Sequence, residues 1–245
     1  MAKRVVSLLW LLTLGATASL QAQETTSPQG PDTWRFRATP YIWTMALKGD
    51  TNIGGIPIEI DEGIRDVLGQ LDFAFEFSLE ARKGNLIFTG DSHLASLTKD
   101  LEFPPGTFNT RHAIVSAAAG YRFAERYDLY AGFRYFNIRS KSDFAAFPNF
   151  SGDGQWMDPL IGGRVRVPLS ERLNFALRGD VGGFGVGSKV GWMIQPTLTW
   201  SVNSKVSLLG GYRHLFVDYE TGSGPDFYAF KVHHTGPGFG VDIRF

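Results

Sequence analysis

From Trp34 to the last residue, apolar and polar residues alternate along unusually long segments, and this period of two constrains the fold more than any other feature. A period of two predicts β-strands. Many of the segments are longer than the roughly five or six residues usual in a globular strand, and they match the roughly 9–11 residues that a tilted strand needs to cross a bilayer. We expect ten strands, at about 34–48, 71–83, 85–99, 109–123, 127–143, 154–168, 172–184, 189–202, 205–220 and 227–245.

The connections between these strands alternate in length. Tight turns are expected around residues 83–85, 124–126, 170–172 and 203–205, and longer loops at 49–70, 100–108, 144–153, 185–188 and 221–226. Short turns at one end and longer loops at the other are typical of a transmembrane barrel whose short side is periplasmic. An even number of strands places both termini on that short side.

The charged residues of these strands share one parity. In the segment 71–83, Phe73, Phe75, Phe77 and Leu79 alternate with Asp72, Glu76, Ser78 and Glu80. An arginine that faces lipid at the bilayer midplane costs about 2–4 kcal/mol, so the charged residues must face an enclosed lumen and their apolar neighbours must face lipid. A soluble barrel would do the reverse. Because half of each span is then polar, the mean hydropathy is close to zero, at −0.09.

A set of inward-facing charged residues is the first candidate site. We expect a salt-bridge network that fills a narrow lumen, because a barrel of about eight strands is just filled by side chains and open channels appear at about 16–18 strands. A selectivity lining for a small or gated pore is the second interpretation, and catalysis the third. The set comprises Glu76, Glu80, Asp91, Arg134, Asp158, Arg164, Arg178, Asp180, Arg213, Asp242 and Arg244.

The N-terminal segment has the features of a secretory signal peptide. Lys3 and Arg4 precede an apolar run over 5–14, and the small-residue stretch ATASLQA follows. The run is too short to span about 30 Å of hydrocarbon. We predict a signal peptide over 1–22, with cleavage after Ala18 as the alternative, a flexible lead over 23–33 and a barrel domain over 34–245.

The final strand carries an apolar stripe that ends on an aromatic residue. Phe239, Val241, Ile243 and Phe245 occupy every second position, with Asp242 and Arg244 between them. This stripe resembles the assembly signal of Gram-negative outer-membrane β-barrel proteins, and the segment WRFRATPYIWTMALKGD is similar to the first strand of small OmpA-like barrels of poorly characterised function. The resemblance implies export to the outer membrane, recognition by the outer-membrane assembly machinery, contact with membrane lipid and lipopolysaccharide, and a monomer.

Two histidine-containing pairs are candidate chemical sites. Asp91 and His93 lie two apart on a strand and point the same way, so they could form an oriented base similar to one half of the site of the omptin proteases. A second carboxylate pair is not evident, which disfavours a protease. His233 and His234 are adjacent on a strand and should face opposite sides, so they are not expected to share a metal ion.

The longest loop, 49–70, contains a helix signal. Gly54-Gly55 predicts a turn in a hairpin above the membrane, and Asp61 could cap a short helix over EGIRDVLGQL with one apolar stripe of Ile64, Val67, Leu68 and Leu71. The helix could plug the barrel mouth, rest on the lipid interface or pack on neighbouring loops. The loop at 145–154 is interpreted as a surface contact loop.

These observations predict an all-β protein, a transmembrane antiparallel up-and-down β-barrel of ten strands, with eight or twelve as alternatives. A soluble exported barrel is the rival fold. We expect a structural or surface-interaction role without catalysis; the alternatives are a narrow channel for small solutes and an outer-membrane hydrolase acting on lipid or peptide. The sequence has no cysteine and a net charge of zero, so we expect no cofactor, no metal and no nucleic-acid partner.

Overall fold

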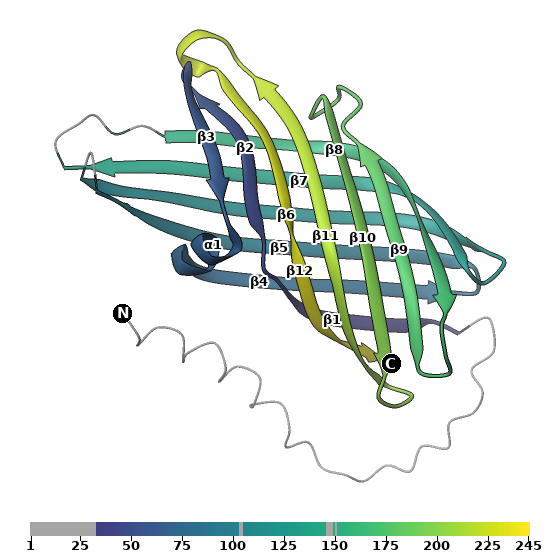
Figure 1. The fold of residues 1–245 in the computed structure, drawn as a ribbon. Helices are drawn as coiled ribbons and strands as arrows, with labels where there is room; N and C mark the ends of the chain where they lie inside the picture. The colour runs from purple at the N-terminus through teal and green to yellow at the C-terminus, as the bar shows by residue number, and fades with distance from the viewer. Residues whose placement is uncertain (1–32, 103–104, 146–148, 150) are drawn as a thin grey trace. The chain divides into compact units, whose positions relative to one another are not determined.

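Twelve strand segments form one antiparallel sheet that closes on itself through pairing of β1 with β12 (Figure 1). The computed structural model describes residues 33–102, 105–145, 149 and 151–245; the predicted signal peptide and all but the last residue of the predicted lead lie outside them. The segments are β1 (Arg35–Trp43), β2 (Ala46–Ile53), β3 (Ile56–Glu62), β4 (Leu71–Lys83), β5 (Leu86–Leu101), β6 (Gly106–Phe123), β7 (Tyr127–Phe144), β8 (Ser151–Pro168), β9 (Leu173–Gly182), β10 (Val190–Ser201), β11 (Val206–Thr221) and β12 (Tyr228–Arg244).

The twelve segments make a barrel of ten strands, as the sequence predicted. β1 and β2 pair with β12 in one unbroken register, from Arg37 opposite Arg244 to Ile53 opposite Tyr228, so they are one barrel strand interrupted at Thr44 and Met45. Their other neighbour changes at that interruption, from β4 to β3. β3 and β4 are therefore the two halves of the second barrel strand, with the helix α1 (Ile64–Gln70) between them.

The connections alternate in length as predicted, but the predicted loop at 49–70 is wrong in extent, because it holds the end of β2, all of β3 and α1. Tight turns join β4 to β5, β6 to β7, β8 to β9 and β10 to β11, all at the end where β1 begins and β12 finishes. The turn after β6 is tight enough that Ala124 and Glu125 both adopt positive φ, at 43° and 59°. At the opposite end, Gly54 and Gly55 turn β2 into β3 with φ of 61° and 87°, the geometry that favours glycine in a two-residue hairpin loop.

In the half of the barrel next to the tight turns, apolar side chains face outward and charged side chains face inward. Phe75 is 50% exposed and Leu177 is 38% exposed, whereas Arg134 is 5% exposed. An exposed belt of large apolar side chains runs around this half, including Phe36, Phe73, Leu79, Phe88, Val115, Leu129, Phe133, Met157, Ile161, Ile194, Leu198, Leu208 and Phe239. A soluble barrel would leave no belt of this extent in water, so this half is built to face hydrocarbon.

Toward the other end of the barrel, the outward face of the same strands becomes polar and the inward face becomes apolar. On β7 the outward residues change from Leu129, Phe133 and Tyr135 to Asn137, Arg139, Lys141 and Asp143. The inward residues change in step, from Asp128 and Arg134 to Phe136 and Ile138. Strand β12 does the same: Asp242 faces inward near one end and Val232 and Phe230 near the other, while Lys231 replaces Phe239 on the outside.

The prediction that apolar residues face outward along whole strands is therefore wrong for the distal half. The reason is the solvent outside the wall. β7 has 18 residues, whereas crossing the hydrocarbon takes about 9–11, so the excess length stands in water, where an apolar interior and a polar exterior are favoured. We call this distal part, including the β2–β3 hairpin, the outer extension.

A packed apolar core fills the lumen of the outer extension. Trp156 is sandwiched between Phe136, with ring centroids 4.8 Å apart, and Tyr219, with centroids 3.9 Å apart. Phe136, Val217 and Val232 have no exposed surface at all. Further buried members are Leu47, Ile53, Leu97, Ile114, Ile138, Met193, Leu215, Tyr228 and Phe230.

The predicted helix forms, and it packs against strands of the barrel. Val67 of α1 is buried in the core cluster, and α1 contacts β2, β3 and β5. Its N-terminus is closed by the Gly63 amide, which donates to Asp66 Oδ2 at 3.0 Å. The predicted packing on neighbouring loops comes nearest to this placement, although the neighbours of α1 are strands and not loops, and Leu68 stays 47% exposed. Among the helices of the described residues, none is long and apolar enough to cross a membrane.

The position of the membrane belt can be tested with one charge placed at two heights on the same face of β8. Ile161 is outward-facing near the middle of the belt and Gln155 is outward-facing in the outer extension. We expect Ile161→Arg to lower the free energy of unfolding by about 2–4 kcal/mol and Gln155→Arg to change it by less than about 0.5 kcal/mol. Urea unfolding of the barrel in lipid vesicles measures both, and equal losses would contradict the belt.

Candidate functional site: a charged cavity in the barrel lumen

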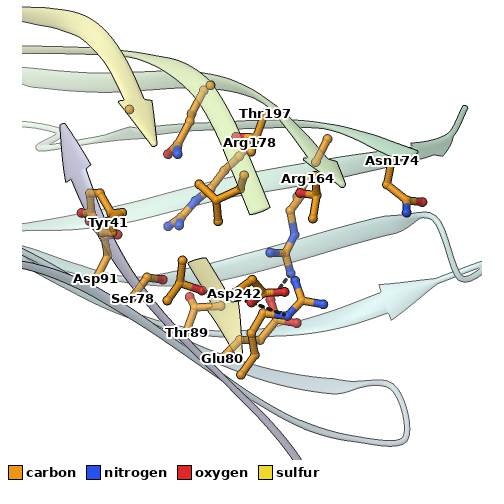
Figure 2. Close-up of a pocket in the computed structure, with 18 of the residues that line it drawn as sticks. Tyr41, Ser78, Glu80, Thr89, Asp91, Arg164, Asn174, Arg178, Thr197 and Asp242 are labelled. Carbon is orange, nitrogen blue, oxygen red and sulfur yellow. Dashed lines mark hydrogen bonds and ion pairs between the residues drawn. The ribbon is translucent and has the colours of Figure 1, made fainter. Parts of the chain in front are cut away.

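The membrane half of the lumen holds a cavity of ≈ 320 Å³ (Figure 2). Its lining reaches Asn174, Ser201 and Arg244, at strand ends beside the tight turns, and at the other end it stops at Trp43 and Arg213. The core of the outer extension begins beyond Trp43. The lumen is therefore a polar cavity at one end and a packed apolar plug at the other.

At the wall of this cavity, the carboxylate group of Asp128 accepts hydrogen bonds from three arginines. Arg122 Nε donates to Asp128 Oδ1 at 2.9 Å, Arg164 Nε donates to Oδ2 at 2.8 Å, and Arg166 Nη2 donates to Oδ2 at 2.5 Å. Arg164 also pairs with Glu80 Oε2 at 2.5 Å, an interaction visible in Figure 2. Side chains from β4, β6, β7 and β8 are thus tied together across the lumen.

A second cluster lies where the cavity meets the apolar core. Arg213 donates from Nη1 and Nη2 to the two Asp91 carboxylate oxygens, both at 3.2 Å, and Nη1 also donates to Tyr41 Oη at 3.1 Å. Cζ of Arg213 lies 5.1 Å from the ring centroid of Tyr41 and 4.9 Å from the ring centroid of Trp43. A planar cation with aromatic faces on one side and a carboxylate on the other suits such a boundary.

The third cluster is a buried ion pair between Arg134 of β7 and Asp180 of β9. Arg134 Nη2 donates to both oxygens of Asp180, at 2.8 and 3.0 Å, and Arg134 Nε donates to Ser116 Oγ at 3.1 Å. Near the floor of the cavity, Asp242 pairs with Arg37 at 3.3 Å and with Arg244 at 3.6 Å.

The remaining members of the predicted set have other partners. Asp158 holds the β9–β10 loop: Ser188, which is fully buried, donates to its two carboxylate oxygens through the amide at 2.6 Å and the hydroxyl at 2.7 Å. Glu76 accepts a hydrogen bond from the amide of Trp43 and contacts His93 Nδ1 at 2.5 Å. Glu76 thereby gives the backbone amide of Trp43 a hydrogen-bond acceptor at the point where β1 no longer pairs with β4. Arg178 donates from Nε to Tyr130 Oη at 3.1 Å.

Asp91 and His93 do not pair with each other. Asp91 binds Arg213 and Tyr41, and His93 binds Glu76. His233 and His234 face opposite sides, as expected: His234 is fully buried, and His233 contacts His214 on the outer face, with Nδ1 and Nε2 2.9 Å apart. Within the described residues no group of His, Asp and Glu is arranged to hold a metal ion.

The predicted set of inward-facing charges omits Arg37, Arg122, Asp128 and Arg166, although each has a readable signal. Arg166 shares the parity of Arg164, and Arg37 shares that of the inward-facing Thr39 and Tyr41. Arg122 and Asp128 flank a tight turn and share the parity of the inward-facing residues of β6 and β7. Parity alone, followed to the strand ends, would have found all four.

The buried Arg134–Asp180 pair provides a test of how far the barrel depends on its lumen network. We expect Asp180→Ala to lower the free energy of unfolding by about 3–5 kcal/mol, because it leaves the Arg134 charge buried without a partner. Asp61→Ala is the control: its pair with Lys48 spans 3.8 Å with side chains 68% and 75% exposed, and its loss should cost no more than about 1 kcal/mol. Urea unfolding in vesicles measures both, and equal small effects would refute the dependence.

Comparison with known proteins gives likeness in fold alone. No family model matches the sequence, and no curated protein matches it. Among solved structures, the chain is similar to Ail, the attachment invasion locus protein of Yersinia pestis (10% identity, 86% of this chain and 98% of that chain, TM-score 0.41). It is also similar to a Pseudomonas aeruginosa FadL homologue (8% identity, 87% and 90%, TM-score 0.42) and to Neisserial surface protein A (13% identity, 86% and 97%, TM-score 0.35).

All three are outer-membrane β-barrels. At these identities and TM-scores they carry no argument about what this chain does. The architecture stands on the chain's own features: ten antiparallel strands, closed by β1 and β12, with an apolar belt outside and a charged lumen inside.

Proposed function

We propose that this chain is an integral barrel of the Gram-negative outer membrane that conducts no solute and has a structural or surface-interaction role without catalysis. The observation that carries this proposal is the packed core of the outer extension. Phe136, Trp156 and Tyr219 stack across the lumen, and the aliphatic residues around them are fully buried. A pore needs a continuous aqueous path, and this core supports a closed barrel.

The tight turns and both strand ends of the closure lie at one end of the barrel, which supports a periplasmic position for that end. The outer extension then projects from the cell. Its outer wall is polar, and on β6 and β7 Arg111 stands directly opposite Arg139, both exposed, with Lys141 two residues further. Like charges directly opposite each other destabilise a strand pair, and anionic groups of lipopolysaccharide at this height would relieve the repulsion.

The position of the C-terminal stripe supports recognition by the outer-membrane assembly machinery. Phe239 and Phe245 are 62% and 69% exposed on the lipid-facing side of β12, the strand that closes the barrel. A stripe that is accessible before insertion and lipid-covered afterwards suits an assembly signal. Because β1 and β12 complete the barrel within one chain, a monomer is sufficient for this proposal.

Conductance in a planar bilayer tests the closed lumen. We expect the refolded wild-type barrel to insert without conductance steps. The double variant Phe136→Ala/Trp156→Ala removes two members of the stack and should admit ions, whereas Tyr135→Ala/Met157→Ala, which alters the neighbouring lipid-facing positions of the same strands, should stay silent. Sustained steps from the wild-type protein would favour the narrow channel and overturn this proposal.

A further inference from the structure

The arginines of the cavity outnumber its carboxylates. Six guanidinium groups line it, those of Arg37, Arg164, Arg166, Arg178, Arg213 and Arg244, against the three carboxylates of Glu80, Asp91 and Asp242, which is an excess of three positive charges. Including Arg122 and Asp128 from the adjoining cluster leaves the excess unchanged. The predicted self-neutralising network is therefore incomplete on the cavity side.

Arg178 is the most distinctive of these arginines. The other five each have a carboxylate partner within 4 Å, whereas Arg178 has no ion pair within that distance among the described residues. Asp180 and Asp91 attract its charge from farther away without contacting it. Its Nε is held by Tyr130 Oη at 3.1 Å, and its guanidinium lies 5.2 Å from the Tyr130 ring centroid. Its two terminal nitrogens make no hydrogen bond to the described protein, and the side chain extends into the hollow in Figure 2.

A net positive charge enclosed by a low-dielectric wall concentrates anions, because the wall focuses the field into the cavity. The fork of a guanidinium matches the oxygens of a phosphate group, which it can bind through two parallel hydrogen bonds. The hydroxyl groups of Thr89 and Thr197 and the amide of Asn174 add neutral donors around the same space. A volume of ≈ 320 Å³ is at the lower end of the range of about 300–1,000 Å³ for small-ligand sites.

We propose that this cavity is a binding site for a small ligand bearing a phosphate group, which enters from the periplasmic end and is held by the terminal nitrogens of Arg178. The packed core beyond Trp43 and Arg213 makes the site a dead end, so the ligand binds and leaves on the same side. The site goes beyond the proposed surface role, but its periplasmic entrance and its dead end rest on the orientation and the closed lumen proposed above. A conducting wild-type barrel would overturn the closed lumen and the dead end, whereas the titration below tests the binding site by itself.

Isothermal titration calorimetry of the full refolded barrel in detergent, with pyrophosphate as the probe, tests the site. We expect saturable binding that weakens as sodium chloride is raised, since the attraction is electrostatic. Arg178→Gln should weaken binding at least about tenfold, because it removes the charge-assisted hydrogen bonds that hold the phosphate group. Arg65→Gln makes the same change of charge at an exposed position of α1, outside the cavity, and should leave the affinity within about twofold of wild type.

A second variant guards against misfolding of the first. Thr89 lines the cavity, and Thr89→Asp adds a carboxylate there without removing an arginine, so it should also weaken binding. Folding of each variant is checked by its gel shift on heating. Absence of saturable binding to the wild type, or equal affinity in wild type, Arg178→Gln and Thr89→Asp, would overturn the proposal, as would an equal loss in Arg65→Gln.

Two sources of the phosphate group are separated by competition. A short-chain phosphatidylglycerol, kept below its micelle concentration, is titrated before pyrophosphate. Loss of the pyrophosphate signal in wild type, and not after a matched phosphate-free detergent, assigns the site to a phospholipid headgroup. An unchanged signal assigns it to a soluble phosphate compound, and both results support the site.

Discussion

The cost of placing a charged side chain in hydrocarbon is the constraint on which the rest of this structure depends. Where the wall faces lipid, Arg134, Arg164 and Arg178 have to turn inward, and their neighbours Phe133, Val165 and Leu177 meet acyl chains. Where the wall faces water, the constraint disappears and the ordinary preference for a dry interior takes over. One continuous set of strands thus changes from one arrangement to the other, and the polar cavity and apolar plug follow from that change.

Buried polar side chains gather in the layer where the polar cavity meets the apolar core. Arg213, Trp43 and the Glu76–His93 pair lie there, each with one polar and one apolar side. Just beyond, His112 and His234 are buried with ring centroids 5.8 Å apart, and each has at least one ring nitrogen without a partner among the described residues. Buried polar groups of this kind lower stability, and their position at the boundary makes this layer the place where the lumen is most sensitive to substitution.

Much of the fold could be predicted from the sequence, because in a membrane barrel parity and strand length have a direct physical cause. The ten strands, the alternating connections and the inward turn of Arg134 and Asp180 all follow from it. The interruption at Thr44 and the placement of α1 could not be predicted, since they depend on which strand lies beside β1. The ion pairs could not be predicted either. Parity shows that Asp91 and His93 face inward, but it does not show that Asp91 pairs with Arg213, which is 122 residues away in the sequence.

A cysteine scan of the outward-facing positions of β7 tests the change of faces most directly, because the native chain has no cysteine. Single cysteines at 129, 131, 133, 137, 139 and 141, with the inward-facing 138 as a control, are exposed to a water-soluble maleimide in proteoliposomes. The account predicts no reaction at 129, 131, 133 and 138, and rapid reaction at 137, 139 and 141. Uniform protection of all the outward positions, or reaction at 138, would contradict it.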